Sequence, residues 1–103
     1  MTFVPEAPPP HAPTARAPEE VAVVDAPVAA RNPVEIGRID GSSSAHPPTG
    51  DGHEDVLARL REVAGKRGCD AIALSPIEQK LYATSAGTPL YRAHQSAHCF
   101  LYP

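Results

Sequence analysis

The stretch Glu54–Pro76, EDVLARLREVAGKRGCDAIALSP, decides the fold, because its hydrophobic period changes from that of a helix to that of a strand. The first part carries one apolar stripe at helical spacing. Its members are Val56, Leu57, Leu60, Val63 and Ala64. Asp51 and Glu54 have the spacing of an N-terminal capping box, and Gly68 is suited to end a helix with positive φ. The pattern predicts a helix over about 52–67.

After Gly68 the apolar residues alternate, which is the period of a β-strand. The large side chains of Ile72 and Leu74 face one way, and small side chains occupy the other face. These small residues are Cys69, Ala71, Ala73 and Ser75. Such a strand is typical of one covered on both faces. Pro76 lacks an N–H group, so we expect it to end the regular pairing.

Residues 1–19, MTFVPEAPPPHAPTARAPE, predict a disordered, proline-rich tether. The chain has 13 prolines, ten of them before residue 49. A segment of this composition buries too little apolar area to offset its ordering entropy, and proline makes it a semi-stiff spacer. The spacing of Pro5 and Pro8 also fits a peptide ligand of SH3 or WW domains, but a linker is the favoured interpretation.

Residues 20–103 are expected to form one small α+β domain. Further strands are predicted at Glu20–Asp25, Val34–Asp40 and Leu90–Tyr102, while Ile77–Tyr82 fits a strand or a turn. Residues 41–52 and 83–89 have the composition of loops. Together with the helix and strand of Glu54–Pro76, these elements give a β-β-α-β-β order, with one helix packed on a small, mostly antiparallel sheet.

Two positions inside the predicted strands suggest local irregularity. Gly37 interrupts an alternating run, which is typical of a β-bulge or a close backbone approach. The alternation of the last strand is imperfect near Gln95, where we expect a second bulge.

The two cysteines are candidates for a stabilising disulfide. A core built from only about 70–80 ordered residues is marginal without such a bond. Cys69 opens the strand after the helix, and Cys99 lies near the end of the last strand. If those strands pair antiparallel, a Cys69–Cys99 bond would add on the order of 3–4 kcal/mol in the chain-entropy model. The alternative is a pair of free buried thiols that pack as small hydrophobic groups.

Five histidines raise the alternative of a metal-binding module, with His94, His98 and Cys99 as ligands. His94 and His98 share a face of a regular strand, but four residues of strand span about 13 Å. One ion could bind both only if the backbone bends between them. Zinc sites need three or four ligands in a compact arrangement. Structurally satisfied or solvated histidines are the favoured interpretation.

Several classes of function are not indicated. The net charge of -3 gives no reason to expect nucleic-acid binding. The serines at 42–44 lack the frame of a nucleophile elbow, and the glycines at 50 and 52 lack the lysine of a phosphate loop. No catalytic or cofactor-binding residue is therefore predicted, and we expect a protein that is not an enzyme.

Short motifs resemble a family of small, uncharacterised bacterial envelope lipoproteins of the myxobacterial type. The motifs are LREVA at 60–64, GCDAI at 68–72, YRA at 91–93 and CFLY at 99–102, with IGRI at 36–39. More distantly, the layout resembles the RcsF family of outer-membrane lipoproteins through SAGTP at 85–89, although RcsF has four cysteines and this chain has two. The GCDAI unit also resembles the family of heavy-metal-binding domains that are distantly similar to metal chaperones.

The resemblance implies a non-enzymatic envelope domain that acts through protein contacts, in stress sensing or as a structural component. It implies a periplasmic or outer-membrane location, with an unidentified envelope protein as partner and a disulfide between Cys69 and Cys99. The chain has no lipobox cysteine and no signal segment, so we expect a lipid anchor only on a segment that is absent from it. A cytoplasmic location is the alternative. The oligomeric state is left open.

Overall fold

Six strands and one α-helix make up the fold in the computed structural model, which describes residues 1–103. The elements are β1 (Thr2–Pro5), β2 (Ala22–Val24), β3 (Val34–Ser42), α1 (His53–Arg67), β4 (Ala71–Leu74), β5 (Glu78–Ser85) and β6 (Thr88–Leu101). Short 3-10 turns at Pro18–Glu20 and Ala29–Arg31 lie on either side of β2. The predicted α+β class, with one helix on a mostly antiparallel sheet, is confirmed.

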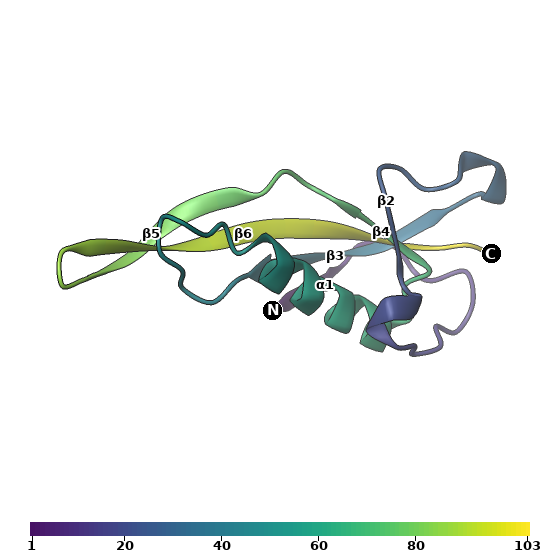
Figure 1. Ribbon diagram of the computed structural model, residues 1–103. Coiled ribbons are helices and arrows are strands. Elements are labelled where there is room, and N and C mark those ends of the chain that lie inside the picture. The colour runs from purple at the N-terminus through teal and green to yellow at the C-terminus, as the bar shows by residue number, and fades with distance from the viewer.

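The long strand β6 is the centre of the sheet (Figure 1). The strand order is β1-β3-β6-β4-β2, and β5 also pairs with β6. One edge of β6 pairs with β3, while the other pairs first with β4 and then, nearer the N-terminal end of β6, with β5. Only β2 and β4 run parallel. Because β6 extends beyond the other strands to form the β5–β6 hairpin, the molecule is elongated, at 52 × 23 × 21 Å.

The core lies between α1 and one face of the sheet. Val56, Leu60 and Ala64 of α1 are fully buried, as the apolar stripe predicts. Alternate residues of β6 face them, and this buried set comprises Ala93, Gln95, Ala97, Cys99 and Leu101. Ile39 and Ile72 complete the layer from the two strands beside β6. The alternation predicted for these strands thus selects which sheet face α1 covers.

The predicted cap residue of α1 is correct at the C-terminal end of the helix only. Gly68 is the C-cap with φ 75°, as predicted. At the other end the prediction of an Asp51 capping box is wrong by one residue, because Gly52 is the N-cap with φ 68°. The Asp51 carboxylate still accepts a hydrogen bond from the His53 N–H group at 2.9 Å. A side chain at Gly52 would meet the hydroxyl of Ser43, which explains why glycine occupies this position.

The N-terminal segment differs from the expected disordered tether. Residues 2–5 form β1, which pairs antiparallel with β3, and the Arg16 N–H group donates to the Gly65 carbonyl at 2.9 Å. Phe3 packs against the core, and this apolar contact offsets part of the entropy cost of ordering a proline-rich chain. The folded unit therefore begins at β1 and is not limited to residues 20–103.

Four local predictions for the strands and the turn between β5 and β6 have different outcomes. The irregularity at Gly37 is confirmed, since the register with β6 shifts between Glu35 and Gly37. The expected bulge near Gln95 is wrong, and the second irregularity lies in β5, between Leu81 and Ala83. The segment Ile77–Tyr82, left open between strand and turn, is mostly strand. The loop expected at 83–89 shortens to a tight turn at Ala86 and Gly87, which both have positive φ.

Candidate functional site

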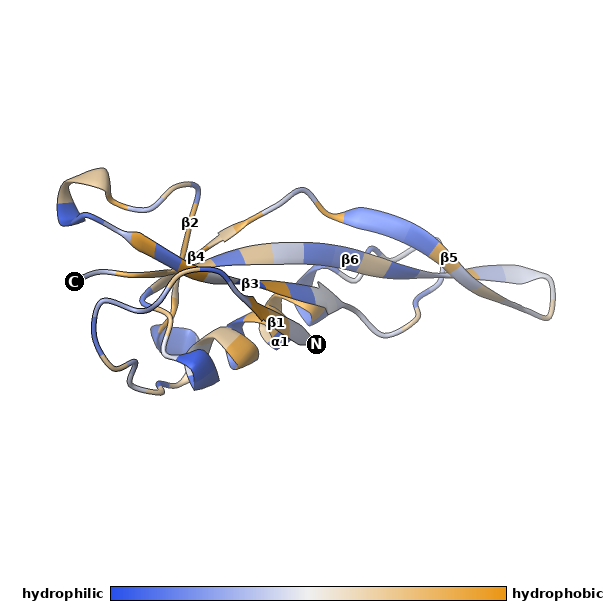
Figure 2. Ribbon diagram, turned by 180° about the vertical axis from the view of Figure 1, so that it is seen from behind, coloured by the Kyte–Doolittle hydropathy of each residue, from blue (hydrophilic) through white to orange (hydrophobic).

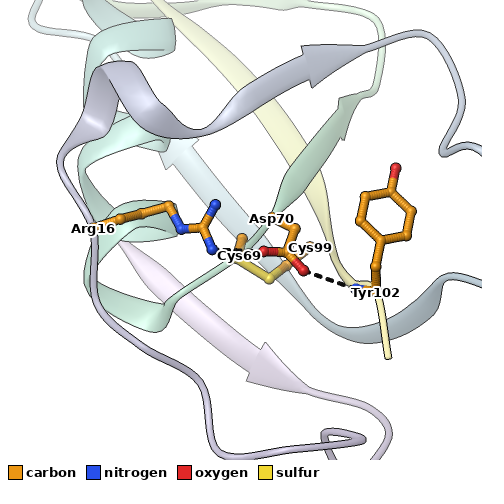
Figure 3. The surroundings of a disulfide bond; sticks show 5 residues. All are labelled: Arg16, Cys69, Asp70, Cys99 and Tyr102. Carbon is orange, nitrogen blue, oxygen red and sulfur yellow. Dashed lines mark hydrogen bonds and ion pairs between the residues drawn. A yellow bond between two sulfur atoms is a disulfide. The ribbon is translucent and has the colours of Figure 1, made fainter. Parts of the chain in front are cut away.

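A disulfide joins the end of α1 to the central strand. Cys69 follows α1 directly and Cys99 lies on β6, with their Cα atoms 5.5 Å apart and both side chains fully buried. The predicted pairing is confirmed, and neither cysteine is free. Antiparallel pairing of β4 with β6 brings the two residues together, which is the arrangement that the sequence suggested. Figure 3 shows the bond beside Asp70.

Asp70, the residue after Cys69, connects both ends of the chain to this region (Figure 3). One carboxylate oxygen pairs with the Arg16 guanidinium at 2.6 Å, and the other accepts the Tyr102 N–H group at 2.8 Å. The carboxylate thereby links the N-terminal segment to the end of β6. This role of Asp70 was not predicted, because no local pattern in the sequence relates Asp70 to residues so distant along the chain.

The sheet face opposite α1 carries a polar cluster. Ser96 donates a hydrogen bond to the Asp40 carboxylate at 2.7 Å, and Arg38 binds the same carboxylate at 3.0 and 3.1 Å. The Ser96 hydroxyl and the Arg38 guanidinium hold the pKa of Asp40 below its usual value. Since Ser96 donates to a carboxylate and not to a histidine, this serine is not arranged as an activated nucleophile.

A shallow depression lies beside this cluster, where β4 ends and β5 begins. Its volume is about 360 Å³, and no hydrophobic residue lines it. Its polar and charged lining comprises Asp40, Ser75, Glu78, Lys80, His94, Gln95 and Ser96. Charges of both signs lie around it, so the depression has no clear preference for an anion or a cation.

The three residues of the metal hypothesis do not come together. Cys99 is in the disulfide and faces α1, whereas the His98 ring contacts the Glu35 carboxylate on the opposite face of the sheet. His94 borders the polar depression. No group of three or more His, Cys, Asp or Glu side chains has an arrangement that could hold a metal ion. The absence of a bend in β6 is the physical reason, because it keeps His94 and His98 far apart.

The β5–β6 hairpin extends away from the rest of the fold (Figures 1 and 2). All eight residues of β5 are exposed, including Leu81 at 64% and Tyr82 at 54%. The Arg92 guanidinium lies 3.9 Å from the centre of the Tyr82 ring, which holds this aromatic group on the hairpin surface. This surface was not predicted from the sequence, although Leu81 and Tyr82 are adjacent in the segment Ile77–Tyr82 that fits a strand or a turn.

No family model, curated protein or solved structure matches this chain. The helices do not combine the length and the apolar character that a membrane span requires.

Proposed function

We propose that this chain is a non-enzymatic domain of the bacterial envelope that acts through protein contacts. The buried Cys69–Cys99 disulfide supports an extracytoplasmic location, because such bonds persist in oxidising compartments and are rare in the cytosol. The resemblance to envelope lipoproteins points the same way. Whether the domain senses stress or has a structural role depends on what it contacts.

The exposed β5–β6 hairpin is the observation that carries the proposal of a protein contact. Leu81 and Tyr82 are large apolar side chains held in solvent on a two-stranded extension. Aromatic side chains are enriched where proteins meet, and an uncovered strand offers unpaired backbone groups to a partner. The polar depression, by contrast, is lined by no hydrophobic residue and carries charges of both signs.

Site-specific photo-crosslinking tests this proposal. A photoreactive amino acid at Leu81 places the reactive group on the hairpin, and the same group at Ala58 places it on the exposed side of α1. After export to the periplasm of a bacterial host and irradiation, we expect a protein adduct from position 81 and little from position 58. Adducts in equal yield from both positions, or from neither, would argue against a contact through the hairpin.

The compartment is tested separately by the redox state of the cysteines. Intact mass of the chain isolated from the periplasm should rise by about 2 Da on reduction, with both thiols protected from alkylation beforehand. The same chain retained in the cytosol should be alkylated and should unfold more readily. Free thiols in the exported protein would contradict the envelope assignment.

A further inference from the structure

β5 is an edge strand whose outer side pairs with no other strand. Figures 1 and 2 show no element beyond it on that side. Its pairing with β6 is irregular between Leu81 and Ala83, so the regular part of the exposed edge that can add a short strand is Glu78–Leu81. Natural proteins usually shield such edges. This edge contains neither a proline nor a covering loop, so its backbone groups can reach a partner.

The backbone hydrogen bonds of β6 show which residues of β5 face the free edge. Tyr91 and Ala93 direct their N–H and C=O groups to the segment 43–46, away from β5. Residues directly opposite in an antiparallel pair point their backbone groups either both inward or both outward. Leu81 pairs with Tyr91, and Gln79 pairs with Ala93. The backbone groups of Leu81 and Gln79 are therefore directed at the open edge.

The sequence around Gln79 is complementary to itself in antiparallel orientation. Residues 77–81 read Ile-Glu-Gln-Lys-Leu. If two copies pair about Gln79, Glu78 lies opposite the partner's Lys80. Ile77, which precedes β5 and packs partly against the core, comes opposite the partner's Leu81. The ion pair and the apolar pair each form twice, because the two-fold axis repeats each contact.

The neighbouring two-fold registers lack this complementarity. Pairing about Lys80 would place two lysines directly opposite each other, which is destabilising. Pairing about Leu81 would leave Glu78 opposite the partner's Thr84, with no ion pair formed. Charge complementarity thus favours one register and a second copy of this chain as the occupant of the edge.

We propose that the chain forms a two-fold dimer in which the β5 edges of two copies pair antiparallel about Gln79. The inference rests on the proposed function, and the protein partner that it names is a second copy of this chain. A contact of about five residues a side is smaller than a standard interface, so the dimer is weak and forms at high local concentration. Tethering of many copies to one membrane surface would supply such a concentration.

Charge reversal with rescue tests the register. Sedimentation equilibrium of the oxidised full chain, from micromolar to millimolar concentration, should show a rise from 10.8 kDa towards twice that mass. Glu78→Lys or Lys80→Glu alone places like charges opposite each other twice, and we expect the dissociation constant to rise at least tenfold. The double reversal restores both ion pairs and should restore the dimer. Lys66→Glu on the exposed face of α1 is the matched control and should leave it unchanged.

Disulfide trapping gives an independent measurement. In the proposed register Gln79→Cys meets its own copy at a Cα separation of about 5.5 Å, which suits a disulfide. Thr84→Cys lies on the same strand far from the axis and should not form a crosslinked dimer. We expect rapid crosslinking at position 79 only.

Several results would overturn the inference. A chain that stays monomeric at all concentrations, a dimer insensitive to the single reversals, or a dimer that the double reversal fails to restore would each do so. Photo-crosslinks from Leu81 to a different protein, together with a monomer in solution, would overturn this inference while leaving the proposed function intact.

Discussion

Cys69 and Cys99 provide the only covalent link between the end of α1 and the strand at the centre of the sheet. The bond spans 30 residues of sequence and closes them into a loop in the unfolded chain. Loop closure of this size stabilises the folded state mainly by restricting the unfolded one. Asp70 adds a polar connection at the same place by binding Arg16 and the Tyr102 N–H group.

Replacing both cysteines, as Cys69→Ala with Cys99→Ala, should lower the free energy of unfolding by about 3–4 kcal/mol. Urea unfolding followed by circular dichroism measures this change. Reduction of the unmodified chain is the matched comparison and should have a similar effect. An unfolding midpoint that does not move on reduction would show that the bond contributes little to stability.

Asp40 links stability to pH at the residue scale. Hydrogen bonds from Ser96 and Arg38 lower its pKa in the folded chain from the ordinary value of 3.8. A carboxylate whose pKa is lowered by folding stabilises the folded state above its unfolded pKa. This contribution is lost as the pH falls from about 4 through the folded-state pKa.

Asp40→Asn should therefore destabilise the chain at neutral pH and have a smaller effect in acid. The side chain is 44% exposed, so the loss at pH 7 should stay within about 1 kcal/mol. Urea unfolding of both proteins at pH 7 and below pH 4 measures the difference. Asp25→Asn, at an exposed position, is the control, and an equal pH effect for both variants would contradict the assignment to Asp40.

At the scale of elements, α1 packs against more than the sheet. Gly65, in its last turn, lies directly against the backbone of Arg16, and its carbonyl accepts the Arg16 N–H group at 2.9 Å. From the sequence, Gly65 is expected to weaken the helix and to permit close packing on a sheet. Its close contact is with the N-terminal segment, which was expected to be disordered.

Gly65→Ala distinguishes the effect of helix propensity at this position from the effect of the close contact with Arg16. Alanine favours a helix over glycine by up to about 1 kcal/mol, yet its Cβ would collide with the Arg16 carbonyl. We expect faster hydrogen exchange of the Arg16 N–H group and a lower unfolding midpoint. Gly50→Ala, where a Cβ meets no atom closer than 3.8 Å, is the control. A raised midpoint with unchanged exchange would show that the segment does not pack there.

At the scale of the whole molecule, the fold has two unequal parts. The body contains the core, the disulfide and the N-terminal segment, whereas the β5–β6 hairpin extends from it with solvent around β5 (Figure 2). β1 covers the edge of β3 at one side of the sheet, and no strand covers the edge of β5. The other outer strands, β1 and β2, are four and three residues long, so β5 offers a partner the longest uncovered strand.

Deletion of residues 1–17 should destabilise the body, because it removes β1 and exposes the surface that Phe3 covers. We expect a loss of at least about 2 kcal/mol in the free energy of unfolding. Phe3→Ala in the full chain should reproduce part of this loss. A disordered tether would behave differently, since its removal would leave the unfolding midpoint unchanged.

Local patterns along the chain predicted the helix, its end at Gly68, the irregularity at Gly37 and the strand after Cys69. The predicted antiparallel pairing of that strand with the last strand was enough to suggest the disulfide. These features depend on backbone preferences and on side-chain period within a few residues. The polar cluster at Asp40 was not predicted, because its partner Ser96 lies on a different strand.

The sequence alone determined the α+β class and the packing face of α1, since hydrophobic period and glycine conformation act within one element. Only the tertiary structure decided that residues 1–19 pack on the body and that β5 is an open edge. The physical reason is that strand pairing depends on contacts between distant residues, such as Phe3 with Ile39. A proline-rich composition disfavours order by itself, but a core with space for one aromatic ring can reverse that preference.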